Sequence, residues 1–223
     1  MRIGIIVAMD KEFEQLSKLF ADDADVKVVK SGIGKVNAAL HTQKLIDEFH
    51  PDAIISTGCA GACKLSINVG DVIISRWVTY HDVWCGKPNV MGQVQDMPAE
   101  YVCDDKLYIA ALNLRWKNTG VNLREGLIAS GDWFVTSKEK AEDIKRRVPE
   151  AFAIDMESAA IAQTCHINSV PFISFRVISD NVFKENNVEQ YENFWDTMAD
   201  KSFTIVAEYV KQIKQLKDFY NYD

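Results

Sequence analysis

Apolar and polar positions along the chain follow two different periods. Short apolar runs bounded by turn residues, such as 3–8 (IGIIVA) and 171–180 (PFISFRVISD), predict buried strands. Between such runs, apolar residues recur three or four positions apart; in 10–20 this spacing brings Phe13, Leu16 and Phe20 to one helical face. The predicted strands cover residues 3–8, 26–30, 52–58, 71–82, 125–132, 151–156 and 171–180. The predicted helices cover 10–20, the part of 31–49 that follows a Gly turn, 104–114, 138–147, a small-residue stretch from about Ser158, and a long amphipathic segment at the C-terminus.

Strands that alternate with helices imply a mostly parallel or mixed sheet with helices on both faces. The chain has 223 residues, of which 48% are hydrophobic, which suits one α/β domain with a substantial core. The predicted fold class is therefore α/β, with residues 1–223 forming a single domain around a central mixed β-sheet. The irregular segment 84–100 is the one long loop, and long loops in compact domains are usually functional.

Charge and composition narrow the class of function. The 32 Asp and Glu outnumber the 25 Lys and Arg, so the surface is acidic and nucleic acid is not an expected partner. The apolar run at the N-terminus is too short to span a bilayer and lacks a cleavage site, so it predicts a buried strand, and no membrane association is expected. The five cysteines are scattered, which is typical of reduced thiols in a cytoplasmic protein, and no spacing predicts a metal site.

The candidate chemistry lies where the predicted strands end, because ligands of such sheets bind at the carboxyl ends of the strands. Acids gather there: Glu12, Asp132, Asp155, Glu157 and Asp180. Arg176 lies inside an apolar strand and needs a carboxylate partner, for which Asp155 and Glu157 are the candidates. If the strand continues through them, Asp155 and Glu157 share one face and Met156 takes the other. The alternative is a strand-to-helix junction, where an acid near the helix N-terminus is favourable.

Four further motifs leave alternatives open. SGIGKV lacks the third Gly of a dinucleotide site, so Gly32 and Gly34 are interpreted as points of close backbone approach. TGCAGA is either an anion or sugar-hydroxyl site or a tight packing turn. Asp180 is either a helix N-cap or a proton donor whose pKa is raised by apolar surroundings. Of the aromatic pair Trp133 and Phe134, one ring either stacks on a heterocycle or belongs to the core.

Taken in order, these stretches resemble one known family. The segments IGIIVAMDKE, KSGIGKVNAAL, DAIISTGCAGA, VGDVIIS, GLIASGDWF, DMESAAIA and FRVISDN resemble the methylthioadenosine/S-adenosylhomocysteine nucleosidases, which belong to the nucleoside phosphorylase superfamily. The resemblance covers nearly the whole chain and implies the nucleoside phosphorylase-like three-layer sandwich. It implies a hydrolase that uses water and no cofactor to cleave the N-glycosidic bond of 5′-methylthioadenosine and S-adenosylhomocysteine, releasing adenine and the thioribose for methionine salvage.

The resemblance also assigns roles to residues. Glu12 activates the attacking water, and Asp180, oriented by Ser179, protonates N7 of the adenine. Glu157 binds the ribose hydroxyls, Met156 packs on the sugar, and Phe134 stacks on the base. Other positions assigned to substrate binding are the backbone of Val135 at the base edge, Gly61, Arg176, and, for the 5′-thio pocket, Met9, Ile33 and Tyr191.

Some positions depart from the family pattern. Cys59 stands where the family usually has Ser, Asp155 replaces a usual Glu, and Trp133 replaces a small residue. The loop 84–100 matches poorly, and in the family this region of a partner subunit helps to close the 5′ pocket. The resemblance therefore implies a homodimer and leaves the preferred 5′ substituent open.

Two other functions compete with this prediction. The first is a phosphate-dependent purine nucleoside phosphorylase. Those enzymes resemble this chain but carry a phosphate-binding Arg at a position where this chain has Ser56. The second is a nucleoside-binding protein without catalysis. An inactive binder has no need to keep Glu12, Glu157 and Asp180 together, so the hydrolase is favoured.

Overall fold

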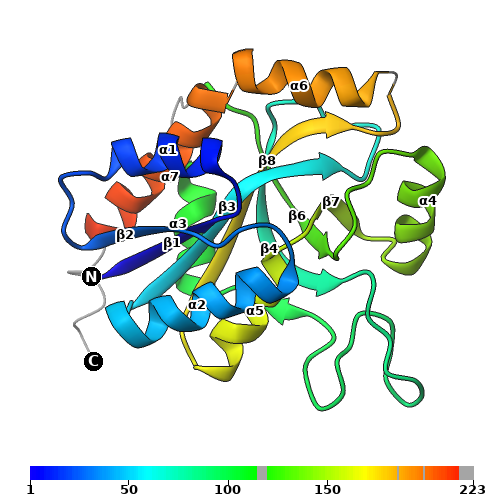
Figure 1. The fold of residues 1–223 in the computed structure, drawn as a ribbon, viewed down its shortest axis with the longest axis horizontal. Helices are drawn as coiled ribbons and strands as arrows, with labels where there is room; N and C mark the ends of the chain where they lie inside the picture. Colours follow the sequence, from blue (N-terminus) through cyan, green and yellow to red (C-terminus); the bar gives the residue numbers. More distant parts are fainter. Residues whose placement is uncertain (115–119, 185, 198, 216–223) are drawn as a thin grey trace.

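A computed structural model describes residues 1–114, 120–184, 186–197 and 199–215 (Figure 1). The strands are β1 (Ile3–Val7), β2 (Val26–Lys30), β3 (Ala53–Ala62), β4 (Val72–Tyr80), β5 (Tyr101–Val102), β6 (Leu123–Ser130), β7 (Ala151–Asp155) and β8 (Phe172–Asn181). The helices are α1 (Asp10–Leu19), α2 (Lys35–Phe49), α3 (Asp105–Asn113), α4 (Lys138–Arg147), α5 (Ser158–Ile167), α6 (Asn187–Thr197) and α7 (Ala199–Gln215). The expected α/β class with a central mixed sheet is confirmed.

The strands form one 8-stranded sheet in the order β2-β1-β3-β7-β6-β4-β5, and β8 pairs with both β3 and β4. Strands β3, β7, β6, β4 and β8 therefore form a closed ring of pairings. β8 runs parallel to β3 and antiparallel to β4, while β7 runs antiparallel to β3. In this arrangement the C-terminal part of β3 lies between the C-terminal parts of β7 and β8, with Gly61 opposite both Ile154 and Asp180. The C-terminal parts of three strands thus meet at one place.

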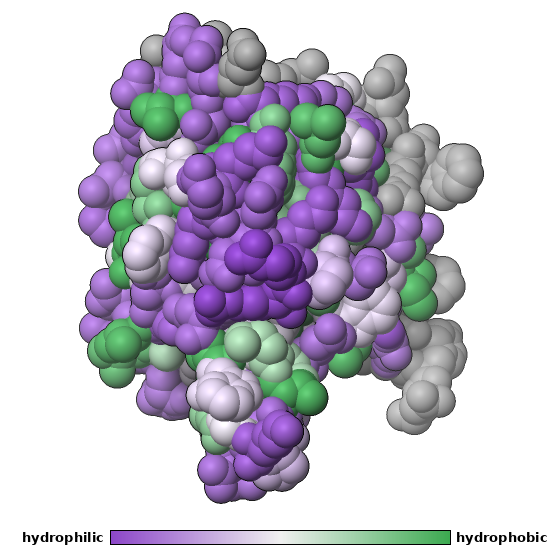
Figure 2. Space-filling view, turned by 90° about the vertical axis from the view of Figure 1, so that its right-hand side faces the viewer, coloured by the Kyte–Doolittle hydropathy of each residue, from purple (hydrophilic) through white to green (hydrophobic). Residues whose placement is uncertain are grey.

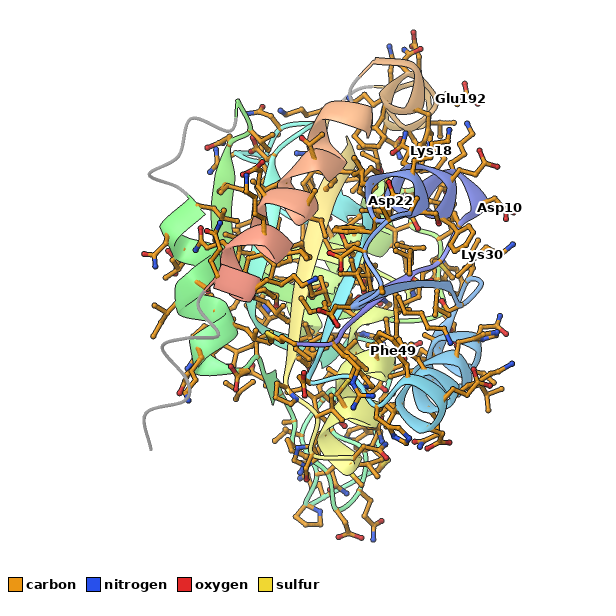
Figure 3. All side chains as sticks on the ribbon, turned by 90° about the vertical axis from the view of Figure 1, so that its left-hand side faces the viewer. Asp10, Lys18, Asp22, Lys30, Phe49 and Glu192 are labelled. Carbon is orange, nitrogen blue, oxygen red and sulfur yellow. The ribbon has the colours of Figure 1, made fainter. Side chains whose placement is uncertain are left out.

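Helices flank the sheet on both sides. In Figures 1 and 3, α2 and α5 pack together on one side, and α3 and α7 pack together on the other. The long strands β3 and β4 are mostly buried, and in β8 every residue is buried. That is the pattern of a strand covered on both faces.

Helix α4 has one buried apolar face and one exposed polar face. Ala141 and Ile144 are buried, and the basic residues of its last turn, Lys145, Arg146 and Arg147, are exposed. Figure 2, which views the side of the molecule on which α4 lies, shows a mostly hydrophilic face with isolated hydrophobic patches. No helix within the described residues is long and apolar enough to cross a membrane.

Two elements were not predicted from the sequence. The C-terminal helix is present as α7, but a separate helix, α6, precedes it and packs on β8. The short strand β5 adds to the edge of the sheet beside Trp77 and Val78 of β4. Both depend on the surface that the rest of the fold offers, which no local pattern encodes.

Candidate active site

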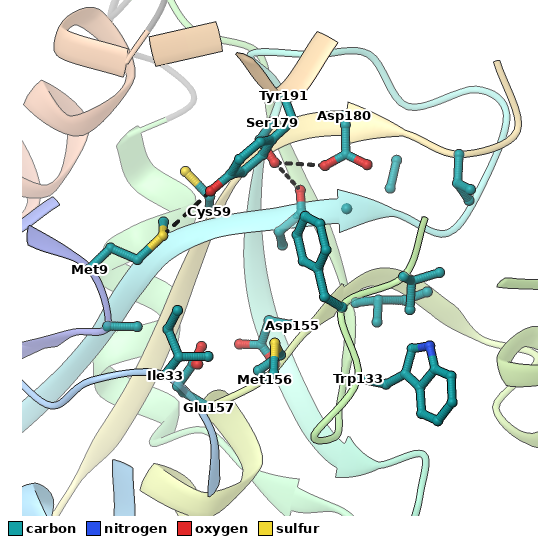
Figure 4. Close-up of a pocket in the computed structure, with 18 of the residues that line it drawn as sticks. Met9, Ile33, Cys59, Trp133, Asp155, Met156, Glu157, Ser179, Asp180 and Tyr191 are labelled. Atoms are coloured by element: carbon teal, nitrogen blue, oxygen red, sulfur yellow. Dashed lines mark hydrogen bonds between the residues drawn. The ribbon is translucent and has the colours of Figure 1, made fainter. Parts of the chain in front are cut away.

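One pocket lies where the ends of β1, β3, β6, β7 and β8 meet, and α6 adds one wall (Figure 4). Figure 4 shows Met9, Cys59, Ser179, Asp180 and Tyr191 on one side, and Ile33, Asp155, Met156 and Glu157 on the other. The remaining lining residues are Ala8, Glu12, Ala60, Gly61, Ala62, Trp133, Phe134, Val135, Ile154 and Val182.

Glu12 is held in place by three backbone N–H groups. It is the third residue of α1 after the N-cap Met9, and one carboxylate oxygen, Oε2, accepts hydrogen bonds from the N–H groups of Ala8 and Met9, both at 3.0 Å. The other oxygen, Oε1, accepts from the N–H of Cys59 at 2.9 Å. Burial raises the pKa of Glu12 above its ordinary value, although these N–H groups and Arg176 act in the opposite direction. The result is a carboxylate of fixed orientation and increased basicity.

Asp155 and Glu157 have different partners, so the strand-to-helix alternative is correct. Strand β7 ends at Asp155, whose Oδ2 accepts from the backbone N–H of Ser158 at 3.1 Å in the first turn of α5. The same oxygen accepts from Nε of Arg176 at 2.6 Å, which confirms Asp155 as the carboxylate partner of the buried Arg. Glu157 is the N-cap residue of α5, and its Oε1 accepts from the N–H of Gly34 at 2.9 Å.

Arg176 lies behind the pocket wall rather than in it. Its Nη2 donates to Oγ of Ser56 at 3.0 Å, and it is absent from the residues that line the pocket. Burial alone would lower the pKa of Arg176, but the carboxylates of Asp155, Glu157 and Glu12 raise it. The guanidinium is therefore charged and neutralises acids that the pocket contains.

Glu157 is an acid whose pKa lies close to neutral pH. Its side chain is 7% exposed, and burial, followed by the charge of Asp155, raises its pKa from 4.5 to about 7. Arg176 and the N–H of Gly34 reduce this effect without cancelling it. Such perturbed acids in a pocket are characteristic of functional sites.

Asp180 lies near the end of β8, on the far side of the pocket from Glu157 (Figure 4). Ser179 donates from Oγ to its Oδ1 at 2.8 Å, which orients the carboxyl group. Burial raises the pKa of Asp180, and hydrogen bonds from Ser179 and Asn187 lower it. Because α6 begins only at Asn187, Asp180 is not the N-cap of that helix. Its position and raised pKa suit a proton donor.

The glycines of TGCAGA allow two acids to approach β3. The segment is not a turn, because β3 continues through Gly61 to Ala62. A Cβ at Gly61 would lie 3.5 Å from Oδ2 of Asp180, and a Cβ at Gly58, where φ is +142°, would lie 2.6 Å from Oε1 of Glu12. A side chain at Gly58 would therefore collide with the Glu12 carboxylate, whereas a Cβ at Gly61 would only touch Asp180 at an ordinary van der Waals distance.

Apolar side chains form the rest of the wall. The rings of Phe134 and Tyr191 meet edge to face, with centroids 5.7 Å apart, and the hydroxyl of Tyr191 donates to the sulfur of Met9 at 3.5 Å. Phe134 and Ile33 are 59% and 53% exposed at the mouth of the pocket. Trp133 lies under Nζ of Lys140, 4.1 Å from the ring centroid. The pocket thus joins an aromatic surface to a group of buried acids.

The chain is similar to known proteins in both sequence and structure. Residues 22–211 match the model of the phosphorylase superfamily. A protein of Geobacillus sp. (strain WCH70) called 5′-methylthioadenosine/S-adenosylhomocysteine nucleosidase is 42% identical over 233 residues, which cover 96% of this chain and 100% of the relative. The chain belongs to the methylthioadenosine/S-adenosylhomocysteine nucleosidase family of this superfamily.

Other members of the nucleosidase family agree in sequence and structure. The nucleosidase of Bacillus subtilis (strain 168) is 38% identical, covering 96% of this chain and 100% of the relative. The Neisseria meningitidis nucleosidase in complex with methylthio-immucillin-A is 36% identical, with a TM-score of 0.87 over 94% of this chain and 98% of that one. The Colwellia psychrerythraea 34H nucleosidase in complex with adenine is 33% identical, with a TM-score of 0.87 over 95% of both chains.

The pocket of this nucleosidase family member contains every residue that the sequence assigned to the site except Arg176. Cys59, Trp133 and Asp155, which the sequence analysis named without assigning them to the site, also line the pocket. Five further lining residues were not named as candidates at all: Ala8, Ala60, Ala62, Ile154 and Val182. Each lies within two residues of an assigned position, at the end of a strand or directly after it. That proximity was the only signal that pointed to them, because small and aliphatic side chains carry no chemistry of their own.

Proposed function

We propose that this protein hydrolyses the N-glycosidic bond of 5′-methylthioadenosine and S-adenosylhomocysteine, releasing adenine and the corresponding thioribose. The observation that carries this proposal is the meeting of three buried acids, Glu12, Glu157 and Asp180, beside the Arg-paired Asp155 in one largely apolar pocket. The family membership and the ligands of the related structures support the same substrate class.

The three acids suit the charges that develop during glycosidic cleavage. The sugar becomes positive as the bond to the base breaks, and negative charge builds on the departing adenine. In the proposed mechanism Asp180 gives its proton to N7 of the adenine, so that the base leaves in a neutral form. A water molecule loses a proton to Glu12 while its oxygen forms the new bond to C1′. Each such proton transfer typically contributes about 100- to 10,000-fold to a rate.

The remaining residues divide the pocket into regions. Glu157, which the N–H of Gly34 holds at the pocket wall, accepts hydrogen bonds from the ribose hydroxyls in this proposal. The ring of Phe134 stacks on adenine, and the backbone of Val135 meets the base edge. The apolar group of Met9, Ile33 and Tyr191 receives the 5′-thio substituent. The buried Arg176 contributes indirectly, by holding Asp155 and by its charge.

The rival phosphorylase activity requires a cation to hold phosphate. Among the described residues that line the pocket, none is Lys or Arg. Ser56, the position at which phosphorylases of the superfamily carry Arg, accepts from Arg176 instead, and that Arg is already paired with Asp155. A phosphate dianion would also meet the negative charge of Glu12 at low dielectric.

The deciding experiment follows adenine release from methylthioadenosine in phosphate-free buffer, and again after phosphate is added. We expect the same rate in both, with free methylthioribose as the sugar product. The Asp180→Asn variant serves as the inactive control. Release that depends on phosphate and yields the sugar 1-phosphate would establish the phosphorylase instead. Saturable binding of methylthioadenosine with no release under either condition would establish the binding-only protein.

We also propose that the protein is a cytoplasmic homodimer, with residues 1–223 forming one domain. Large apolar side chains are exposed on the loop 84–100, where Trp84 is 62% and Val90 55% exposed, and on α2, where Val36 is 69% and Leu40 63% exposed. Exposed apolar groups of this kind mark protein interfaces. Its cysteines are free thiols, as expected in a reducing compartment. Light scattering at micromolar concentration is expected to give twice the mass of the chain; a monomer with full activity would disprove the dimer.

A further inference from the structure

An ion-pair cluster outside the pocket connects two segments that contribute to it with a third segment, which follows β4. We call it the Lys35 cluster, formed by Lys35 at the start of α2, Asp82 after β4 and Asp132 after β6. Nζ of Lys35 lies 2.8 Å from Oδ2 of Asp82 and 3.8 Å from Oδ2 of Asp132. The backbone joins in: the N–H of Lys35 donates to Oδ1 of Asp132 at 2.8 Å, and the N–H of Asp132 donates to Oδ2 of Asp82 at 2.9 Å.

The cluster lies directly beside two different parts of the pocket. The residue before Lys35 is Gly34, whose N–H holds Glu157, the acid proposed to bind ribose. The residues after Asp132 are Trp133, Phe134 and Val135, which form the proposed base-binding wall. A side chain at Gly34 would place its Cβ 3.0 Å from Oδ1 of Asp132, so the two segments are in close contact. The distance between the ribose and base sites therefore depends on this cluster.

The base-binding segment is also constrained from its other side. Gly131 packs on the buried ring of His81, where a Cβ would lie 2.4 Å from Cε1 of the histidine. The N–H of Gly131 donates to the backbone oxygen of Asp155 at 3.1 Å. Gly131 is thus fixed to the sheet, while the residues that follow it are held toward α2 by Asp132.

We propose that Lys35 is a positioning residue that sets the separation between the base-binding and ribose-binding parts of the pocket. This inference rests on the proposed function and assigns it a residue outside the pocket lining. Lys35 contacts both aspartates, and its Nζ also lies 5.5 Å from the centroid of the Tyr80 ring in β4. Without its charge the two carboxylates repel each other, and the segment 132–135 moves away from the start of α2.

A change in the separation between the base-binding and ribose-binding parts of the pocket should affect the affinities for adenine and for a nucleoside differently. Adenine alone contacts only the base-binding wall, so a small displacement of that wall moves the ligand with it and costs little affinity. A nucleoside must satisfy both walls at once, so the same displacement weakens or strains one set of contacts. Loss of Lys35 should therefore reduce affinity for the nucleoside more than for free adenine.

The chain offers a matched control. Lys214 in α7 also bridges two aspartates, with Nζ 2.5 Å from Asp23 and 3.6 Å from Asp25, and its side chain is 26% exposed against 24% for Lys35. Lys214 lines a separate groove, which shares no residue with the pocket. Lys214→Met thus removes the same kind of interaction without touching the segments that the Lys35 cluster connects.

The experiment measures binding of adenine and of methylthioadenosine by calorimetry in the non-hydrolysing Glu12→Gln background. We expect Lys35→Met to raise the Kd for methylthioadenosine roughly tenfold and the Kd for adenine less than about twofold, as a displacement of the walls predicts. Lys35→Arg should restore nucleoside binding, because Arg can also bridge two carboxylates. Lys214→Met should leave the Kd values for adenine and methylthioadenosine unchanged, while it lowers the melting temperature about as much as Lys35→Met does.

Several outcomes would overturn the inference. An equal loss of adenine and nucleoside binding would mean that Lys35 merely keeps the segment folded, and no loss of either would mean that it does not act on the pocket. The proposed function is tested separately, by turnover of the wild-type protein. If the wild type binds nucleoside without releasing adenine, the hydrolase proposal fails while the positioning role of Lys35 remains measurable.

Discussion

The substitution Glu157→Gln is expected to stabilise the protein at alkaline pH while it damages the active site. The folded state holds a proton on Glu157 up to about pH 7, whereas the unfolded chain releases it near 4.5. The folded state therefore binds more protons between these values, and stability is lost as the pH rises through this window. Compared with a group that stays protonated in both states, this difference in pKa lowers the free energy of unfolding by about 3 kcal/mol at pH 8.5 and by about 1 kcal/mol at pH 5. Gln has the shape of the protonated acid, can still accept from the N–H of Gly34, and never bears the charge.

Urea unfolding of both proteins at pH 5 and pH 8.5, at equal concentration, measures this effect. The advantage of Glu157→Gln should grow by about 2–3 kcal/mol from the lower to the higher pH. Glu150→Gln, at an exposed position, serves as the control for removal of a carboxylate that is not buried. An advantage that is the same at both pH values, or a variant less stable than the wild type at pH 8.5, would refute the reasoning. At pH 8.5 the gain in stability should accompany a loss in kcat/KM of roughly 100-fold or more, because Glu157 faces the ribose with a charge at that pH and Gln does not.

Three further substitutions test the other buried charges. Asp180→Asn should lower kcat by at least about 100-fold while the protein stays folded, since an amide cannot deliver a proton to the base; a variant that keeps a tenth of the rate removes Asp180 from the mechanism. Glu12→Gln should stop hydrolysis while calorimetry still detects nucleoside binding, and loss of that binding would make Glu12 a binding residue instead. Asp155→Asn should cost about 3 kcal/mol or more in urea unfolding, because Arg176 is then buried without its counter-charge. A cost below about 1 kcal/mol, typical of an exposed pair, would contradict this estimate.

Local sequence patterns were sufficient for much of the fold. The segment 138–147 was predicted as a helix, and α4 has these bounds; in the structure Ser137 caps its N-terminus, and Ala141 and Ile144 form its buried face. The apolar strands predicted the order of elements, and the rule that ligands bind at strand ends placed most of the pocket. These predictions succeed because a helix cap or a buried face depends on residues that are close together in the chain.

The tertiary structure decided which side chains meet and what each one does. The sequence left Asp155 and Glu157 as equivalent partners for Arg176, and the choice depended on where β7 ends and α5 begins. The segment TGCAGA continues as strand only because β7 and β8 pair with it from both sides.

By itself the sequence determined the α/β class, the order of most elements and the family to which its motifs belong. It also determined which acids were available at the strand ends. Only the tertiary structure showed that Lys35 lies between Asp82 and Asp132, that Arg176 lies behind the pocket, and that the pKa of Glu157 is raised to about 7. The physical reason is that burial and electrostatic interaction depend on distances in space between residues far apart in the chain, and no periodicity along the sequence records those distances.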